Sequence, residues 1–248
     1  MNLKICWLYP DLMSTYGDRG NIICLQKRCQ WRGIETVVQN EIEGADLIVG
    51  GGAQDRQQEI VIEDLRLKKD LLKKMFDDGV PGLFVCGSPQ LLGHYYVLAD
   101  GRKVEGLGIF DMVTKSGFGK PRLIGNLVAQ ISHAEMLKQV QHDTIVGFEN
   151  HSGRTYLGKI KPFAQVISGF GNNGEDKTEG AIYKNCLATY SHGPFLPKNP
   201  HIADWLVKTA LEVKYKKEVE LEQLDDRLEN KAHDFIIKNS KTGKFISG

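Results

Sequence analysis

The sequence predicts an α/β fold in which a mostly parallel sheet is covered by helices on both faces. The chain has 248 residues, of which 41% are hydrophobic and 25% are charged, enough for one large α/β domain or two small ones. Short apolar runs rich in β-branched residues recur along it, and helix-like segments separate the early ones. Such alternation is typical of parallel strands whose connecting helices pack on both sides of the sheet.

Eight apolar runs, each bounded by turn residues, are the predicted strands. In chain order they are LKICWLY, TVVQN, DLIVGG, GLFVCG, RLIGNLVAQ, TIVGFEN, QVISGFG and CLATYSHG. The later runs follow one another with little helix between them. We therefore expect part of the sheet to be antiparallel or mixed.

Helical spacing predicts the connecting elements. The segment NIICLQKRCQWRG has apolar residues on one side and stops at Gly33. The stretch after Gly52 has apolar residues at near-helical intervals, which are Ile60, Leu65, Leu71, Leu72, Met75 and Phe76. The chain is helical again after His201.

The end of the chain reads as an amphipathic helical tail. The segment VELEQLDDRLENKAHDF spaces five apolar residues along one helix face, which are Val219, Leu221, Leu224, Leu228 and Phe235. No linker or repeat interrupts the chain, so we expect one main domain over residues 1–215 and the tail over 216–248. Packing of the tail on its own domain is favoured over docking on a partner.

Composition excludes several classes of partner and location. Lys and Arg total 32 against 31 Asp and Glu, which leaves no basic excess for binding nucleic acid. The N-terminal apolar run is interrupted by Pro10, and no segment reaches the ~18 apolar residues that membrane insertion requires. Five cysteines occur singly, without a CxxC pair, which argues against a disulfide framework or a zinc site. We expect a cytoplasmic protein with reduced thiols.

The stretch GLFVCGSPQLLG places Cys86 where a strand ends and a helix begins. Open α/β sheets bind their ligands at such edges. Gly87 allows a strained turn, Ser88 is a good N-cap, and Pro89 then takes the first helical position. The helix N-terminus would stabilise a thiolate, and Gln90 lies within its first turn. The alternative, a small buried hydrophobic cysteine, is about equally supported by this turn alone.

Two further segments support a catalytic site. The glycine run of LIVGGG can offer backbone N–H groups as an oxyanion hole, although an ordinary tight turn is the simpler reading. In ATYSHGP, His192 lies just beyond a strand and could act as the base for Cys86, with His151 as its rival. The remaining histidines are expected at the surface, and they are His94, His133, His142, His201 and His233. No metal site is expected, since the spacing of His133, His142 and His151 suits none.

Read in order, GGG, CGSPQLLG and SHGP resemble class I glutamine amidotransferases of the cobyric-acid-synthase type, which have a flavodoxin-like sheet. Within that family, the chain resembles the GatD group, the glutaminase subunits of lipid II isoglutaminyl synthase. The motifs that carry this resemblance are TYGDRGNIICLQKRCQWRGI, GGAQDRQQ, EGLGIFD, IVGFENHSGRTYLG, GFGNNGEDKTEG and TYSHGPFLPKNP. They extend from about Trp7 to about Asp204.

The resemblance implies a nucleophile at Cys86 and a base at His192. It places the oxyanion turn at Gly51 and Gly52, with Gly87 donating the second N–H.

It also implies two contacts to the substrate glutamine, by Gln90 and by Arg122. The Arg122 guanidinium can grip an α-carboxylate with two hydrogen bonds, although a solvated surface cation is the alternative.

The chain departs from the family in three places. Ser88-Pro89 stands where the family usually has Gly-Tyr. Pro194 stands two residues after His192, where many class I enzymes have an acid, so no orienting group is apparent there. The segment from Ile131 to Asp143 is longer than expected and polar, which suggests a surface excursion.

The resemblance implies hydrolysis of L-glutamine to glutamate and ammonia, with no metal or other cofactor. It further implies a heterodimer with a MurT-like subunit of the Mur-ligase family, which would use the ammonia and ATP to amidate the D-glutamate of lipid II. The closest alternative is a glutaminase subunit of another synthetase, such as one for cobyric acid. A catalytically inactive flavodoxin-like binding module and a stand-alone cysteine hydrolase are the others.

Overall fold

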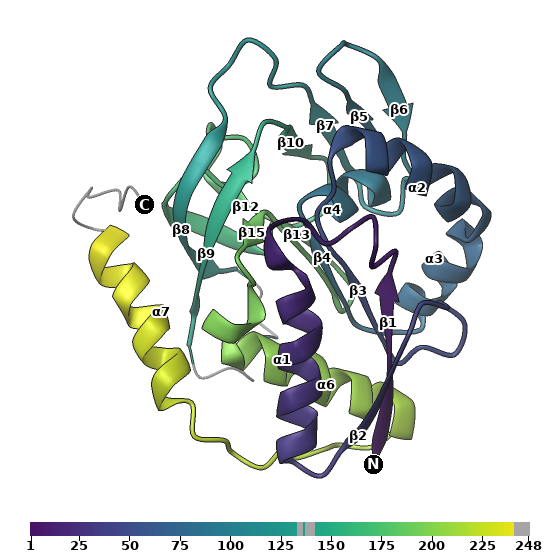
Figure 1. Cartoon of the computed structure of the whole chain (residues 1–248), viewed down its shortest axis with the longest axis vertical. Helices are drawn as coiled ribbons and strands as arrows, with labels where there is room; N and C mark the ends of the chain where they lie inside the picture. Colours follow the sequence, from purple (N-terminus) through teal and green to yellow (C-terminus); the bar gives the residue numbers. More distant parts are fainter. Residues whose placement is uncertain (133–135, 137–141, 241–248) are drawn as a thin grey trace.

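A six-stranded sheet forms the centre of the protein (Figure 1). The structure is a computed structural model that describes residues 1–132, 136 and 142–240. The strand order is β13 (Ala181–Tyr183), β14 (Cys186–Thr189), β4 (Gly82–Val85), β3 (Leu47–Gly50), β1 (Asn2–Leu8) and β2 (Glu35–Gln39). Every neighbouring pair is parallel except β13 and β14. The predicted mostly parallel sheet is therefore confirmed.

Helices cover both faces of this sheet, as expected (Figure 1). One face packs against α1 (Arg19–Trp31) and α6 (Pro200–Tyr215). The other face packs against α2 (Asp55–Leu67), α3 (Lys69–Asp77) and α4 (Gly87–Leu92). Successive side chains of a strand point to opposite faces of the sheet. Because helices cover both faces, the side chains on either side of the central strands are apolar, and the strands appear in the sequence as continuous apolar runs.

The stretch predicted to be helical after Gly52 forms two helices that meet at Lys68. Four of its six apolar residues are buried, whereas Ile60 is 55% exposed and Leu71 is 38% exposed.

Two smaller sheets flank the carboxyl edge of the central sheet. The first contains β10 (Arg154–Leu157), β7 (Met112–Lys115), β5 (Tyr95–Val97) and β6 (Lys103–Glu105). The second contains β12 (Thr178–Glu179), β11 (Ala164–Ser168), β8 (Leu123–Ile131), β9 (Thr144–His151) and β15 (Ser191–His192). The pairs of the second sheet are antiparallel, which confirms the expected mixed pairing.

All eight predicted runs form strands, and the last one divides into β14 and β15. The chain leaves the central sheet after Thr189 and joins the second sheet at Ser191. The strands absent from the prediction have two to four residues each, too short for a recognisable period, and they are β5, β6, β7, β10, β12 and β13.

The C-terminal tail differs from the expected single helix. Residues 217–226 are not helical, and α7 (Arg227–Ser240) begins where the carboxylate of Asp225 and the carbonyl of Asp226 accept backbone N–H groups. The helix packs against β8, β9 and the 3₁₀ helix η2 (Leu196–Lys198). Leu228 and Phe235 are 75% and 55% exposed, so the predicted apolar face does not form the contact.

The segment from Ile131 to Asp143 lies largely outside the described residues. Met136, which is described, is buried in the core, so at least this residue is not on the surface. Residues 241–248 also lie outside the described part. Among the helices that the structure describes, none is long and apolar enough to cross a membrane.

Two histidines expected at the surface are buried instead. His201 is 7% exposed and His233 is 1% exposed. Their rings lie near each other and near His142, with centroids 5.4 to 5.7 Å apart. The His233 ring contacts the Thr144 hydroxyl at 3.1 Å and the Lys198 carbonyl at 2.8 Å, which anchors α7. The tertiary contacts of α7, absent from any local pattern, explain the difference.

Arg28 joins three distant parts of the chain through a buried ion network. Its guanidinium is 2% exposed and donates to the carboxylates of Asp204 on α6 and Asp226 before α7, at 2.6 to 2.9 Å. Burial by itself raises the pKa of Asp204, but hydrogen bonds from Arg28 and Arg32 outweigh it and hold that pKa below its usual value. The network fastens α1 to α6 and to the start of α7.

We expect Arg28→Ala to lower the free energy of unfolding in urea by about 3–5 kcal/mol, because the partly buried Asp226 loses its arginine partner and Asp204 keeps only Arg32. The exposed neighbour Lys27 is the control, and Lys27→Ala should change it by no more than about 0.5 kcal/mol. Because the folded pKa of Asp204 is lowered, its stabilisation is present above about pH 4 and is lost as the pH falls. The decrease in the free energy of unfolding on acidification should therefore be smaller in Arg28→Ala. Equal effects of the two substitutions would contradict this account.

Candidate functional site

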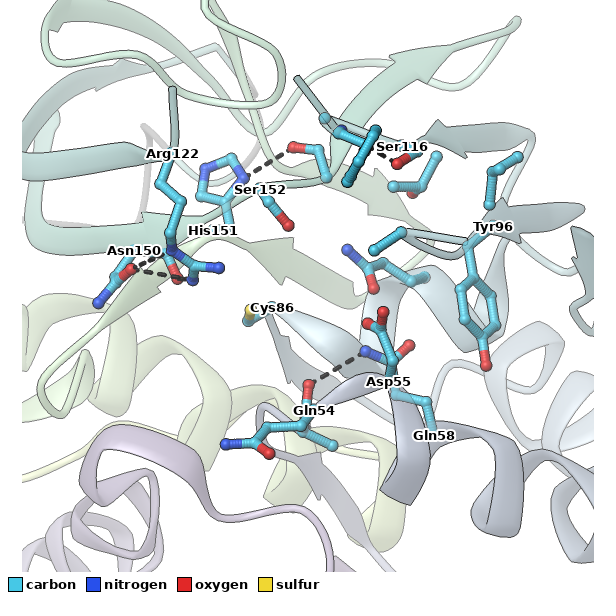
Figure 2. A pocket seen from close by; sticks show the side chains of 18 of the residues that line it. Gln54, Asp55, Gln58, Cys86, Tyr96, Ser116, Arg122, Asn150, His151 and Ser152 are labelled. Atoms are coloured by element: carbon cyan, nitrogen blue, oxygen red, sulfur yellow. Dashed lines mark hydrogen bonds between the residues drawn. The ribbon is translucent and has the colours of Figure 1, made fainter. Parts of the chain in front are cut away.

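Cys86 occupies a strained turn between β4 and α4, at the floor of a cavity of about 630 Å³ (Figure 2). Its backbone has φ 54° and ψ −96°, a region that non-glycine residues rarely adopt. Its N–H donates to the Thr189 carbonyl at 2.9 Å, which ties the turn to β14. Strain of this kind costs on the order of 1–3 kcal/mol and clusters at functional sites. The side chain is half-buried and faces the cavity.

The start of α4 differs from the prediction. The helix begins at Gly87, so Ser88 and Pro89 lie in its first turn and Ser88 is not the N-cap. The Ser88 hydroxyl donates instead to the carbonyl of Gly51. A tertiary contact to the glycine turn replaces the local capping bond.

His192 lies beside Cys86 and has no exposed surface. A methyl group added at Gly52 would lie 2.8 Å from His192 Cε1 and 3.3 Å from Cys86 Cβ, so both side chains pack against this glycine. The ring of Tyr16 meets the imidazole edge-on, with centroids 5.0 Å apart. Antiparallel pairing of β15 with β9 fixes the backbone of His192.

Asp18 contacts the other side of the imidazole. Its Oδ1 lies 3.3 Å from His192 Nδ1. Burial by itself lowers the pKa of His192, but the negative charge of a Cys86 thiolate and the Asp18 carboxylate outweigh it and raise that pKa to about 10. The imidazole is therefore protonated at neutral pH. Its Nε2 is buried without a hydrogen-bond partner in the described chain.

Asp18 is a candidate site residue that the sequence did not reveal. It lies between the 3₁₀ helix η1 (Thr15–Gly17) and α1, 174 positions before His192. The position two residues after the histidine, where many class I enzymes have an acid, is occupied by Pro194. The only sequence signal of Asp18 is its place in the motif TYGDRGN.

Within the glycine turn, Gly52 differs from the expectation. The N–H of Gly52 donates to Asp18 Oδ2 at 2.6 Å, so it does not face the cavity. Gly51 is packed so closely that an added Cβ would lie 2.3 Å from the Met13 carbonyl. The next peptide group, of Ala53, is the better candidate, because a Cβ on Gly87 would lie 2.9 Å from the Ala53 nitrogen. Neither Ala53 nor Gly87 donates its N–H to an acceptor within the described residues.

Gln90 and Arg122 line the same cavity as Cys86. Gln90 is 8% exposed, and its Nε2 donates to the Tyr190 hydroxyl at 3.1 Å. Arg122 is exposed and donates to the side-chain and backbone oxygens of Asn150 at 3.0 to 3.1 Å. Figure 2 shows Arg122 and Asn150 on one side of Cys86, with Asp55 on the other. The structure thus brings together the candidate residues from β4, α4, β15 and the segment before β8.

His151 lines this cavity as well, but its environment differs from that of His192. Its Nδ1 donates to the Gly153 carbonyl at 2.9 Å, and its Nε2 lies 3.9 Å from Glu149 Oε2. Burial lowers the pKa of His151 to about 4, so the ring is neutral. No group of three or more His, Cys, Asp or Glu within the described ranges could hold a metal ion.

Comparisons with known proteins identify the family of this chain. A family model for the CobB/CobQ-like glutamine amidotransferase domain matches residues 4–200. The chain is 41% identical to the GatD subunit of lipid II isoglutaminyl synthase (glutamine-hydrolyzing) of Staphylococcus aureus, over 98% of both chains. It is 38% identical to the corresponding subunit of Streptococcus pneumoniae, over 91% of this chain and 87% of that one.

A solved structure supports the fold class. That of PurLQS from Thermotoga maritima superposes with a TM-score of 0.58 at 11% identity, covering 88% of this chain and all of the other. At this identity the likeness concerns the fold alone. The family model and the two relatives in Staphylococcus aureus and Streptococcus pneumoniae show that the chain belongs to the CobB/CobQ-like glutamine amidotransferase family.

Proposed function

We propose that this protein is the glutamine-hydrolysing subunit of a lipid II isoglutaminyl synthase. The observation that carries the hydrolytic chemistry is Cys86, held in a strained turn beside the protonated His192 and opening into the cavity. The choice of lipid II as the final acceptor rests on the relatives that are 41% and 38% identical over most of their length.

The arrangement accounts for each step of glutamine hydrolysis. The Cys86 thiolate attacks the side-chain carboxamide, and the N–H groups of Ala53 and Gly87 hold the resulting oxyanion. His192 then donates its proton to the leaving ammonia, which leaves a γ-glutamyl thioester on Cys86. His192 next takes a proton from water, which hydrolyses the thioester to glutamate and regenerates the thiolate. These steps use only groups of this chain and need no cofactor.

Two residues give the cavity its selectivity for glutamine. Arg122 binds the α-carboxylate, for which its planar guanidinium is suited. Gln90 presents its side-chain oxygen to the donor groups of the substrate. Both already lie at the cavity wall, held by Asn150 and Tyr190.

The ammonia is consumed by a partner subunit. By its relatives' names this chain is one subunit of a synthase, and a MurT-like subunit of the Mur-ligase family fits the second role. That subunit would use ATP to activate the α-carboxyl of D-glutamate in the lipid II stem peptide, giving D-isoglutamine. The heterodimer would work in the cytoplasm. Residues 1–215 would form the glutaminase domain, followed by the helical tail.

Replacing the nucleophile tests the division of labour. In the purified complex with the partner, ATP and lipid II, Cys86→Ala should abolish amidation with glutamine, because no thioester can form. Ammonium salt, at a pH where free ammonia is appreciable, should restore it. Cys24→Ala is the control and should leave both activities intact. Amidation that persists with glutamine would remove Cys86 from the mechanism, and failure of ammonium to rescue would show that this subunit does more than supply nitrogen.

Removing the charge of Asp18 tests its role beside His192. Asp18→Asn should lower the pKa of His192 from about 10, because burial then acts with less opposition. The alkaline limb of the pH profile should move to lower pH, and kcat should fall about 10²-fold or more. NMR titration of the His192 ring and steady-state rates measure the two effects. The exposed residue Asp11 is the control, and an Asp18→Asn profile that matches Asp11→Asn would refute the role.

Arg122 is tested through the affinity for glutamine. Arg122→Ala should raise the KM for glutamine roughly 10- to 100-fold, the scale of a lost charged hydrogen-bond pair, with a smaller effect on kcat. Arg122→Lys should rescue only partly, because a point charge cannot reproduce the two-pronged contact. Lys120→Ala, at the same rim, is the control. An unchanged KM would show that Arg122 is a solvated surface cation that does not bind glutamine.

A further inference from the structure

We propose that Tyr190 is a positioning residue for glutamine recognition: its hydroxyl holds the Gln90 side chain so that the amide oxygen faces the cavity. The inference rests on the proposed glutaminase function and on the contact of Gln90 with the substrate. Neither the family match nor the motifs assign a role to Tyr190.

Tyr190 is fixed at the point where the chain passes from β14 to β15. Its side chain is 2% exposed, and its ring stacks on His151 with centroids 3.9 Å apart and planes 20° apart. Its N–H donates to Glu179 Oε1 at 2.9 Å, and the same oxygen accepts from the Thr189 hydroxyl at 2.6 Å. Backbone and ring are therefore both held, and the hydroxyl has one accessible position.

The hydroxyl belongs to a chain of hydrogen bonds. It lies 2.5 Å from Thr155 Oγ1, which lies 2.7 Å from Thr114 Oγ1. Burial raises the pKa of Tyr190 to about 12, and the charge of Cys86 adds to this effect, so the phenol keeps its proton. The hydroxyl accepts from the Gln90 amide nitrogen, which leaves its single proton available for the Thr155 oxygen.

This constraint sets the direction of the Gln90 amide. Its Nε2 lies 3.1 Å from the Tyr190 hydroxyl. A Cβ at Gly153 would lie 2.8 Å from Nε2, so the glycine leaves room for the nitrogen and for little else. The amide oxygen makes no hydrogen bond in the described part of the chain and is left for the cavity that Gln90 lines.

An oxygen is the useful end of the amide at this wall. The α-ammonium and the carboxamide NH₂ of glutamine are both hydrogen-bond donors, and they need an acceptor. A reversed amide would set NH₂ against these donors. Without the tyrosine hydroxyl nothing would fix the direction, and part of the population would present the wrong end to the substrate.

The test is Tyr190→Phe, measured in the full complex with glutamine as substrate. The KM should rise about three- to tenfold, the usual scale of one hydrogen bond, while kcat is largely retained. Tyr96→Phe is a matched control: Tyr96 is also 2% exposed and lines the same cavity, but its hydroxyl has no hydrogen-bond partner in the described chain. An unchanged KM in Tyr190→Phe, or an equal rise in both variants, would overturn the proposal.

A double-mutant cycle separates positioning from a general structural effect. Gln90→Leu removes the group through which Tyr190 is proposed to act, so adding Tyr190→Phe to it should change the KM no further. Independent effects that multiply would overturn the proposal. If Tyr190→Phe fails to fold, Thr155→Val is the deciding variant, because without the Thr155 hydroxyl the phenol O–H can point toward Gln90. A raised KM then supports the proposal, and an unchanged KM overturns it. Absence of glutaminase activity in the wild-type complex would instead contradict the proposed function itself.

Discussion

The parallel pairing of β4 with β14 is the contact on which the rest of the site depends. These strands come from segments about 100 residues apart, and their register places Val85 opposite Thr189. Parallel strands end at the same edge of a sheet, so the residues that follow them meet. The hydrogen bond from the Cys86 N–H to the Thr189 carbonyl continues the pairing one residue further and holds the strained turn in place. Tyr190 and His192 follow directly on the β14 side.

Around this edge, charge is balanced within a small volume. The imidazolium of His192 lies between the Cys86 sulfur and the Asp18 carboxylate, and Asp18 also holds the N–H of Gly52. A buried cation would be costly without such partners. Gly52 makes the arrangement sterically feasible, because any side chain there would collide with His192. One aspartate thus contacts both His192 and the glycine turn next to Cys86.

Two histidines of the same cavity region show how environment decides their chemistry. His192 is protonated because anionic groups surround it, whereas burial keeps His151 neutral and its Nδ1 bonded to a carbonyl. His151 instead supports the ring of Tyr190. Two side chains of the same type can take different roles when their environments shift their pKa values in opposite directions. The wall that holds Gln90 is accordingly built from neutral hydrogen-bonding groups.

The sequence by itself determined the eight main strands, the α/β class and the turn at Cys86, because apolar periodicity and turn residues act over a few positions. It also pointed to His192, Gln90 and Arg122 through their motifs. Tertiary structure alone decided the partner of His192, the N–H groups that remain free beside Cys86, and the start of α7. These depend on contacts such as Asp18 with His192, which join residues 174 positions apart. Such contacts arise from packing in three dimensions, and local sequence patterns carry no record of them.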